Sequence, residues 1–222
     1  MPPSRQIPLQ FPEASLSFDD MSITGANRAV CAAIRTVERW PYHVFCLIGS
    51  EGSGITTLAH AWARERDATY LTADEFSKIN LKAIEDLSSK DVVIDDVDQI
   101  KRADGLLMLL SAFQRTGHRV LLAAHSAPAS WHVQSPDLNS RLHAAPLAEI
   151  PAPDEELMRA RLKRAFARSV LELPDSVEDY LVTRLGLDYS LIEHSAEILA
   201  GASGERPLTI PLAREILEEE QS

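Results

Sequence analysis

A glycine-rich segment at residues 49–57 carries the clearest chemical signature in the 222-residue chain. It reads Gly-Ser-Glu-Gly-Ser-Gly-Ile-Thr-Thr and matches the G-x-x-x-x-G-K-[ST] pattern of a phosphate-binding loop, except that Ile55 stands at the lysine position. Such a loop aims backbone N–H groups at phosphate oxygens, and the dipole of the following helix adds to the attraction. The residues expected to contact a nucleotide are Gly49, Gly52, Ser53, Gly54, Ile55, Thr56 and Thr57.

The missing lysine changes the chemistry expected of this segment. Thr56 still offers a hydroxyl to Mg²⁺, but the aliphatic side chain of Ile55 cannot neutralise the β- and γ-phosphates. We therefore expect the binding of ADP or ATP with Mg²⁺ to be weakened. The alternative interpretation is a loop that keeps its shape after losing its ligand.

Two carboxylates, Asp95 and Asp96, directly follow the apolar run at residues 92–94. Acidic residues at the end of a buried parallel strand lie where open α/β sheets bind their ligands. This arrangement predicts that Asp95 holds Mg²⁺ together with Thr56, and that Asp96 orients a water molecule. Solvated acids that cap a following helix are the alternative.

The elements that would position these residues form an alternating pattern of short apolar runs and helical segments. Such runs are typical of strands buried in a parallel sheet. They lie at residues 43–48, 68–71, 91–94, 119–124 and, more weakly because of a proline, 145–150. Strands that alternate with helices predict an α/β fold with a five-stranded parallel sheet flanked by helices.

Beyond the prolines at positions 151 and 153 the pattern is helical. A basic run on the first of these helices, from Arg159 to Arg168, is either a solvated face or a partner contact. The parts expected are an N-terminal tail at residues 1–14, an α/β base domain at 15–151 and a small all-helical lid domain at 152–222.

Charge and composition exclude several classes of function. The net charge is −11, from 22 basic and 33 acidic residues. This balance argues against an autonomous DNA-binding domain, because phosphate neutralisation drives most of that affinity. No apolar run approaches the roughly 20 residues of a membrane span, and residues 1–11 lack the apolar block of a signal peptide. Cys31 and Cys46 do not have the spacing of a metal site. These features predict a cytoplasmic protein with no membrane partner.

Together these motifs resemble the AAA+ module of the DnaA family, and in particular its shorter Hda-type regulators. The resemblance covers nearly the whole chain and implies an AAA+ P-loop fold followed by a helical lid. It is carried by residues 17–29, 49–57, 58–61, 94–97, 136–142 and 208–217. In the stretch at 136–142, Arg141 stands where the family has its arginine finger, which acts in trans on a nucleotide held by a neighbouring subunit. An ordinary surface arginine on a short helix is the alternative.

The chain also departs from the family pattern. His125 stands where a polar sensor residue is expected, with a packed histidine at the strand end as the alternative. Ser190 or a neighbour lies where the lid has its second-sensor arginine. With Ile55, these departures remove positive charge or phosphate donors from the expected site. The resemblance therefore implies that this chain is not itself an efficient ATPase.

The N-terminal tail contains Gln-Ile-Pro-Leu-Gln-Phe at residues 6–11. This hexapeptide resembles the Q-[LI]-x-L-x-[FL] motif by which bacterial proteins bind the sliding clamp of DNA polymerase. Its proline favours an extended backbone, which lowers the ordering cost of binding, and its apolar residues suit a pocket. The residues expected to contact the clamp are Gln6, Ile7, Leu9 and Phe11.

The resemblance implies a negative regulator of replication initiation. Such a protein binds the sliding clamp (the β subunit) and promotes hydrolysis of DnaA-bound ATP through Arg141, without sequence-specific DNA binding of its own. A homodimer is a further expectation. Two alternatives remain open: an active AAA+ ATPase, and an adaptor that tethers another client to the clamp.

Overall fold

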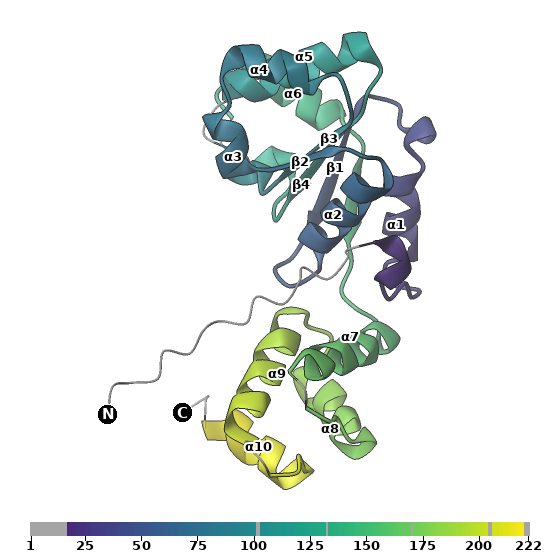
Figure 1. The fold of residues 1–222 in the computed structure, drawn as a ribbon, viewed down its shortest axis with the longest axis vertical. Coiled ribbons are helices and arrows are strands. Elements are labelled where there is room, and N and C mark those ends of the chain that lie inside the picture. Colours follow the sequence, from purple (N-terminus) through teal and green to yellow (C-terminus); the bar gives the residue numbers. More distant parts are fainter. Residues whose placement is uncertain (1–16, 101–102, 132, 170, 204–205, 220–222) are drawn as a thin grey trace, which may run out of the picture.

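The computed structural model describes residues 17–100, 103–131, 133–169, 171–203 and 206–219 (Figure 1). Its centre is a parallel sheet in the order β2-β3-β4-β1-β5. The strands are β1 (Val44–Gly49), β2 (Thr69–Thr72), β3 (Val92–Asp95), β4 (Val120–Ala124) and β5 (Leu147–Ile150). Each coincides with one of the apolar runs in the sequence, so the predicted five-stranded parallel sheet is confirmed.

Alternation along the strands divides the core into two layers. Phe45 and Leu47 of β1 face one side of the sheet, where they join a cluster that includes Ile34 and Trp62. Their neighbours in β1 face the other side, in a cluster with Phe113. Helices therefore cover both faces, as an all-parallel sheet requires.

The first face is covered by α1 (Arg28–Arg35) and α2 (Ile55–Glu65), whose apolar residues belong to the first cluster. The second cluster draws its helical residues from four other helices, and Figure 1 shows these helices together on the far side of the sheet. They are α3 (Ala73–Lys78), α4 (Leu81–Leu87), α5 (Ala103–Thr116) and α6 (Pro136–Ala144).

The described chain beyond β5 is helical, and we call its four helices the C-terminal bundle. They are α7 (Glu155–Arg168), α8 (Asp175–Leu185), α9 (Ser190–Ser203) and α10 (Ile210–Glu219). Asp154 caps α7 by accepting from the Leu157 N–H, and its second oxygen accepts from the Ala26 N–H. The bundle therefore begins with a carboxylate that also fastens it to the segment before α1.

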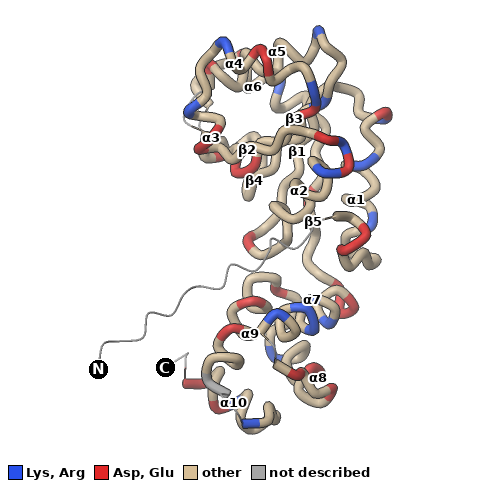
Figure 2. Tube along the Cα trace, viewed as in Figure 1, with Lys and Arg blue, Asp and Glu red and all other residues tan. Residues whose placement is uncertain are grey.

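Figure 2 shows the basic residues along α7, and their side chains have partners inside the chain. Arg159 and Lys163 both contact the buried carboxylate of Glu178, at 3.5 and 3.2 Å. Arg168 pairs with Glu193 of α9, and Arg164 donates to the backbone oxygen of Asp20. Much of this charge therefore serves the packing of the bundle and its attachment to the rest of the chain. In the described residues, no helix is long and apolar enough to cross a bilayer.

Candidate functional site

The glycine-rich loop joins the end of β1 to the start of α2. Gly52 and Gly54 have φ values of +72° and +88°, a region that glycine adopts without the steric cost of a Cβ. The Ser53 hydroxyl is buried beneath the loop and has no hydrogen-bond partner among the described residues. A Cβ on Gly49 would lie 2.5 Å from that hydroxyl oxygen, so the loop has no room for a side chain there.

The side chain at the lysine position faces the protein interior. Ile55 is 3% exposed and belongs to the cluster that joins α2 to the sheet. Thr56 follows it as an exposed residue in the first turn of α2. The loop thus presents the backbone and one hydroxyl to a ligand, and its own sequence supplies no cation.

A cation reaches the loop from α7. The Arg161 guanidinium donates from Nη1 to the Gly52 carbonyl and from Nη2 to the Ser53 carbonyl, each at 2.5 Å. The same group lies 4.5 Å above the ring of Tyr189, at the start of α9. Burial lowers the pKa of Arg161 below its usual value. Sequence reasoning placed Arg161 only within a basic run, because nothing in its local sequence indicates that a distant loop will receive it.

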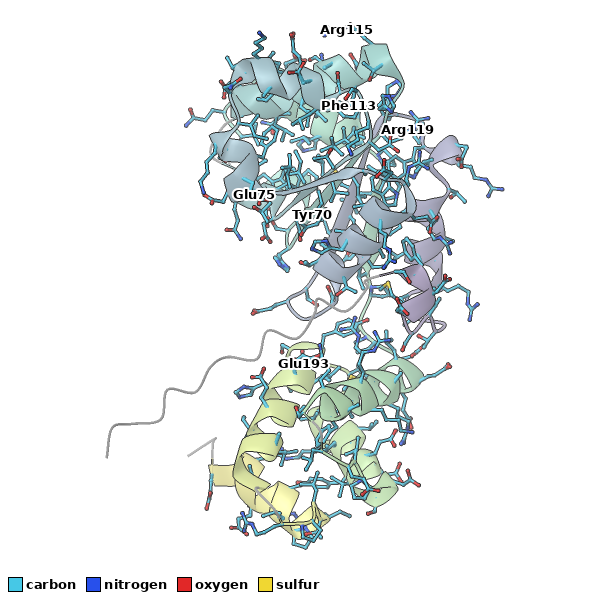
Figure 3. All side chains as sticks on the ribbon, viewed as in Figure 1. Tyr70, Glu75, Phe113, Arg115, Arg119 and Glu193 are labelled. Carbon is cyan, nitrogen blue, oxygen red and sulfur yellow. The ribbon has the colours of Figure 1, made fainter. Side chains whose placement is uncertain are left out.

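The two carboxylates after β3 are also engaged by the chain's own side chains. Asp95 is 2% exposed, and its Oδ2 accepts a hydrogen bond of 2.6 Å from the Tyr70 hydroxyl. Tyr70 extends from the edge strand β2 (Figure 3). Burial, and then the hydrogen bond to Asp95, raise the pKa of Tyr70. The carboxylate predicted to hold Mg²⁺ is therefore already bonded to a phenol that the sequence did not single out.

Asp96 and His125 meet at the same edge of the sheet. Asp96 has a φ of +55°, and its Oδ1 lies 3.6 Å from His125 Nε2. His125 Nδ1 lies 3.0 Å from the Gly49 carbonyl, and because a carbonyl only accepts, Nδ1 carries the proton in this contact. Burial, followed by the charge of Asp95, raises the pKa of Asp96, and His125 opposes this shift. His125 thus joins the loop to the end of β3.

Ser190, the other departure from the family pattern, is the first residue of α9. Its hydroxyl and its N–H both donate to the carboxylate of Asp188, which caps the helix. A Cβ on Gly52 would lie 3.2 Å from the Ser190 Cα, so this residue adjoins the loop.

These contacts show how the residues present fit a Mg²⁺-nucleotide. The loop has the shape and backbone for a phosphate, but the Lys position is aliphatic and the expected metal ligand already bonds to Tyr70. Among the described residues, no group of three or more His, Cys, Asp or Glu side chains gathers to hold a metal ion. The loop backbone and the Thr56 hydroxyl therefore fit a phosphate and its metal, whereas Ile55 supplies no cation and one oxygen of Asp95 is already hydrogen-bonded.

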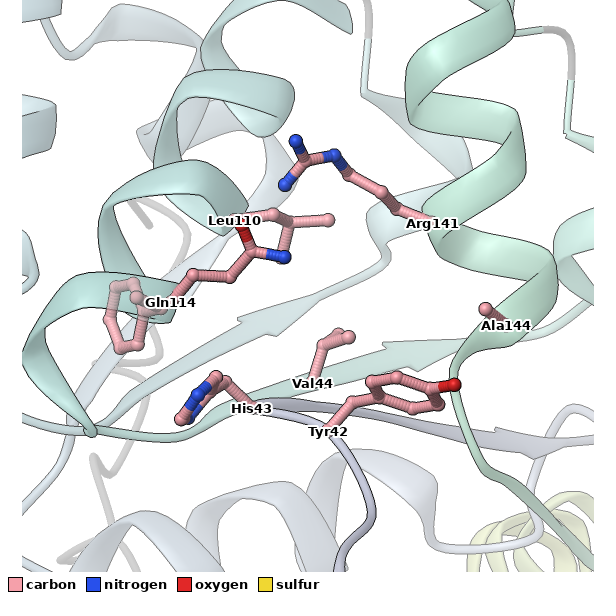
Figure 4. Close-up of a pocket in the computed structure, with 8 residues that line it drawn as sticks. Tyr42, His43, Val44, Leu110, Gln114, Arg141 and Ala144 are labelled. Carbon is pink, nitrogen blue, oxygen red and sulfur yellow. The ribbon is translucent and has the colours of Figure 1, made fainter.

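Arg141 lies on α6 at the opposite end of the sheet. It lines a cavity of about 110 Å³ with Tyr42 and Val44, which flank the start of β1, and with residues of α5 (Figure 4). Its side chain is 27% exposed, and its Nε lies 3.4 Å from Asp137. The buried Nη1 has no hydrogen-bond partner within the described chain.

The strand β1 separates Arg141 from the loop of its own chain. Its residues span roughly 20 Å at about 3.3 Å per residue, with Arg141 at one end and the loop at the other. Arg141 therefore cannot serve its own loop. The four tail residues Gln6, Ile7, Leu9 and Phe11 lie outside the described residues.

Comparison with known proteins gives relatives in replication initiation. No family model matches the chain. An uncharacterised protein of Haemophilus influenzae is 28% identical over 187 residues, which are 78% of this chain and 80% of that protein. The chromosomal replication initiator DnaA of Flavobacterium psychrophilum is 23% identical over 92% of this chain, which spans only 48% of that relative.

Solved structures of DnaA have a similar fold. Domain III of Thermotoga maritima DnaA has a TM-score of 0.76 at 17% identity, over 92% of this chain and 96% of that one. AMPPCP-bound DnaA from Aquifex aeolicus has a TM-score of 0.71 at 20% identity, over 93% and 71% of the two chains. These likenesses confirm the predicted AAA+ P-loop fold.

Proposed function

We propose that this chain, which is similar in sequence to DnaA over most of its length, is an Hda-like negative regulator of replication initiation. In this proposal it promotes the hydrolysis of ATP bound to DnaA and does not turn over ATP itself. Its partners are DnaA and the sliding clamp of DNA polymerase. The observation that carries the proposal is the position and incomplete hydrogen bonding of Arg141.

Two features of Arg141 support a role on another subunit. Within the described chain its side chain makes one hydrogen bond, the long one to Asp137, and its Nη1 has no partner there. A guanidinium fork suits two oxygens of a phosphate, and in this proposal the buried Nη1 becomes exposed on assembly so that it can donate to one of them. Since its own loop lies at the far end of β1, the phosphate it meets must belong to another molecule.

The proposal also includes a degenerate nucleotide site. A DnaA relative of the same fold was solved with AMPPCP, so the fold itself accommodates a nucleotide. In this chain Ile55 removes a cation, Tyr70 engages Asp95 and Arg161 engages the loop carbonyls. We therefore expect ADP or ATP to bind weakly, through the loop amides and without a strongly held Mg²⁺.

Clamp binding is the part of the proposal that rests on sequence alone. The motif at residues 6–11 supplies two apolar anchors, Leu9 and Phe11. Truncation of a true anchor costs about 2 kcal/mol or more of binding energy. Replacing both with alanine should therefore abolish binding to the clamp in a pull-down and leave thermal unfolding unchanged. If the double variant binds the clamp as well as wild type does, clamp binding through residues 6–11 would be ruled out.

The central experiment measures the conversion of labelled ATP to ADP on DnaA in the presence of clamp-loaded DNA. Wild type should stimulate the conversion. Arg141→Ala should bind clamp and DnaA but lose about 10³-fold in stimulated rate, because a finger acts on transition-state charge. Arg141→Lys should restore little, since a point charge lacks the planar fork. Arg115→Ala, an exposed arginine on α5, removes the same charge and should behave as wild type.

Three outcomes would count against the proposal. Full stimulation by Arg141→Ala would exclude the finger. No stimulation by wild type, together with intact clamp binding, would favour an adaptor for another client. Turnover of ATP by the isolated chain would instead favour an active ATPase.

A further inference from the structure

The C-terminal bundle meets the glycine-rich loop directly. A Cβ on Gly52 would lie 3.0 Å from the backbone carbon and oxygen of Tyr189, so the tip of the loop lies against the start of α9. A Cβ on Gly54 would lie 2.5 Å from Arg161 Nη2. Groups of the bundle therefore occupy the space immediately around the loop, and the two glycines leave room for them.

Arg161 binds both sides of this junction. Its two terminal nitrogens donate to consecutive loop carbonyls, while its plane lies over the Tyr189 ring. A planar guanidinium suits such a paired contact, because its N–H groups point in fixed directions and its face attracts an aromatic ring. The Tyr189 hydroxyl donates in turn to the Pro151 carbonyl, at the junction between β5 and α7. The contact therefore links the loop, α7, the start of α9 and the segment that connects β5 to α7.

The carbonyls that Arg161 uses belong to the loop whose lysine position is aliphatic. In a loop with a lysine, the cation is local and is directed at the ligand. Here the cation comes from a helix 108 residues further along the chain and is directed at the loop backbone. It stabilises the contact between two parts of the same molecule.

We infer that Arg161 is a positioning residue that fastens the C-terminal bundle to the glycine-rich loop, so that their relative placement does not require a nucleotide. Arg161 holds the loop and the bundle together, as a ligand bound between them would otherwise do. This inference goes beyond the proposed function and does not depend on which client the chain meets.

The test measures the distance between the two parts with spin labels on the full-length protein. Lys82→Cys on α4 and Glu197→Cys on α9 place labels at exposed positions, and the native Cys31 and Cys46 are both buried. Wild type should give one narrow distance distribution, unchanged when MgADP is added. Arg161→Met keeps the aliphatic stem and removes the hydrogen bonds, so the ratio of open to closed molecules should rise about tenfold or more.

Arg168→Met is the matched control. Arg168 lies on the same helix, and its partner Glu193 belongs to the bundle itself (Figure 3). The control should keep the narrow distribution of wild type even if it melts at a lower temperature, which separates a positioning role from general stability. A narrow, wild-type distribution in Arg161→Met would overturn the inference.

Circular dichroism establishes that each variant is folded. If Arg161→Met does not fold, Arg161→Lys provides the decisive comparison, because it keeps the charge and loses the fork. An open fraction between those of wild type and a fully released bundle would support the inference, and an unchanged distribution would overturn it. Since neither DnaA nor the clamp is in the sample, failure here leaves the proposed function standing.

Discussion

Removal of the Tyr70 hydroxyl tests whether the chain satisfies its own buried carboxylate. Tyr70→Phe deletes the donor of the 2.6 Å bond to Asp95 and keeps the ring, which stacks on His60 at 3.7 Å between centroids. Asp95 is 2% exposed, so water cannot replace the donor without a structural change. A hydrogen bond to a charged group contributes about 1.5–3 kcal/mol. For a chain of this size each kcal/mol shifts Tm by about 2–4 °C, so we expect Tm to fall by about 3–12 °C.

The assay is thermal unfolding followed by circular dichroism, with Tyr42→Phe as the control. Tyr42 is 53% exposed, and deletion of its hydroxyl should change stability by no more than about 0.5 kcal/mol. A Tyr70→Phe protein as stable as wild type at pH 8 would refute the reasoning. So would an equal loss in Tyr42→Phe, because the effect would then not depend on Asp95.

The pH dependence gives a second, independent readout. The pKa of Tyr70 is raised in the folded protein by burial and by Asp95, whereas an unfolded tyrosine loses its proton at about pH 10. The hydroxyl's contribution is therefore complete below that pH and falls as the pH rises above it, because the unfolded state gains by ionising first. The stability difference between wild type and Tyr70→Phe should be constant from about pH 7 to 9 and shrink above about pH 10.

Three further predictions concern the loop and the core. Gly54→Ala should destabilise the protein more than Gly117→Ala. Gly117 also has a positive φ, of +80°, but open space around it, so its replacement should cost only backbone strain of about 1–2 kcal/mol. Equal urea midpoints of the two variants would contradict the contact between Gly54 and Arg161. Ile55→Lys should lower stability, because it puts an amine at a core position, and should not give tight MgADP binding in a fluorescence titration while Tyr70 and Arg161 remain. Burial raises the pKa of the Cys46 thiol to about 12. Cys46 should therefore resist a thiol reagent in the native protein at pH 8 and react at once in urea. Rapid reaction of Cys46 in the native protein would show that the core opens.

The sheet could be predicted from the sequence because its signal is local. Each strand is a run of consecutive apolar residues, and the strand limits in the structure differ from those runs by one or two residues. The loop was recognisable for the same reason, since its glycines and Thr56 lie within nine residues. The boundaries expected for the three parts of the chain stay predictions.

The partners of the loop could not be predicted, because they come from distant segments. Arg161 reaches Gly52 across 109 residues, and Tyr70 reaches Asp95 from the neighbouring strand. Neither residue has a spacing rule or a flanking motif. The sequence did indicate that Ile55 cannot neutralise phosphates, but the burial of its side chain depends on how α2 packs against the sheet.

The two ends of the sheet also set a polarity for assembly. A head-to-tail row grows when each subunit offers one surface and accepts the complementary surface of the next. This chain carries Arg141 at one end of β1, while at the other end lies a loop whose lysine position is aliphatic. If Arg141 acts in trans and the loop holds a nucleotide only weakly, both as proposed, the chain has a donor end and no matching acceptor end. Such a subunit terminates a row and cannot extend one, so its effect on a growing assembly would be felt at substoichiometric amounts.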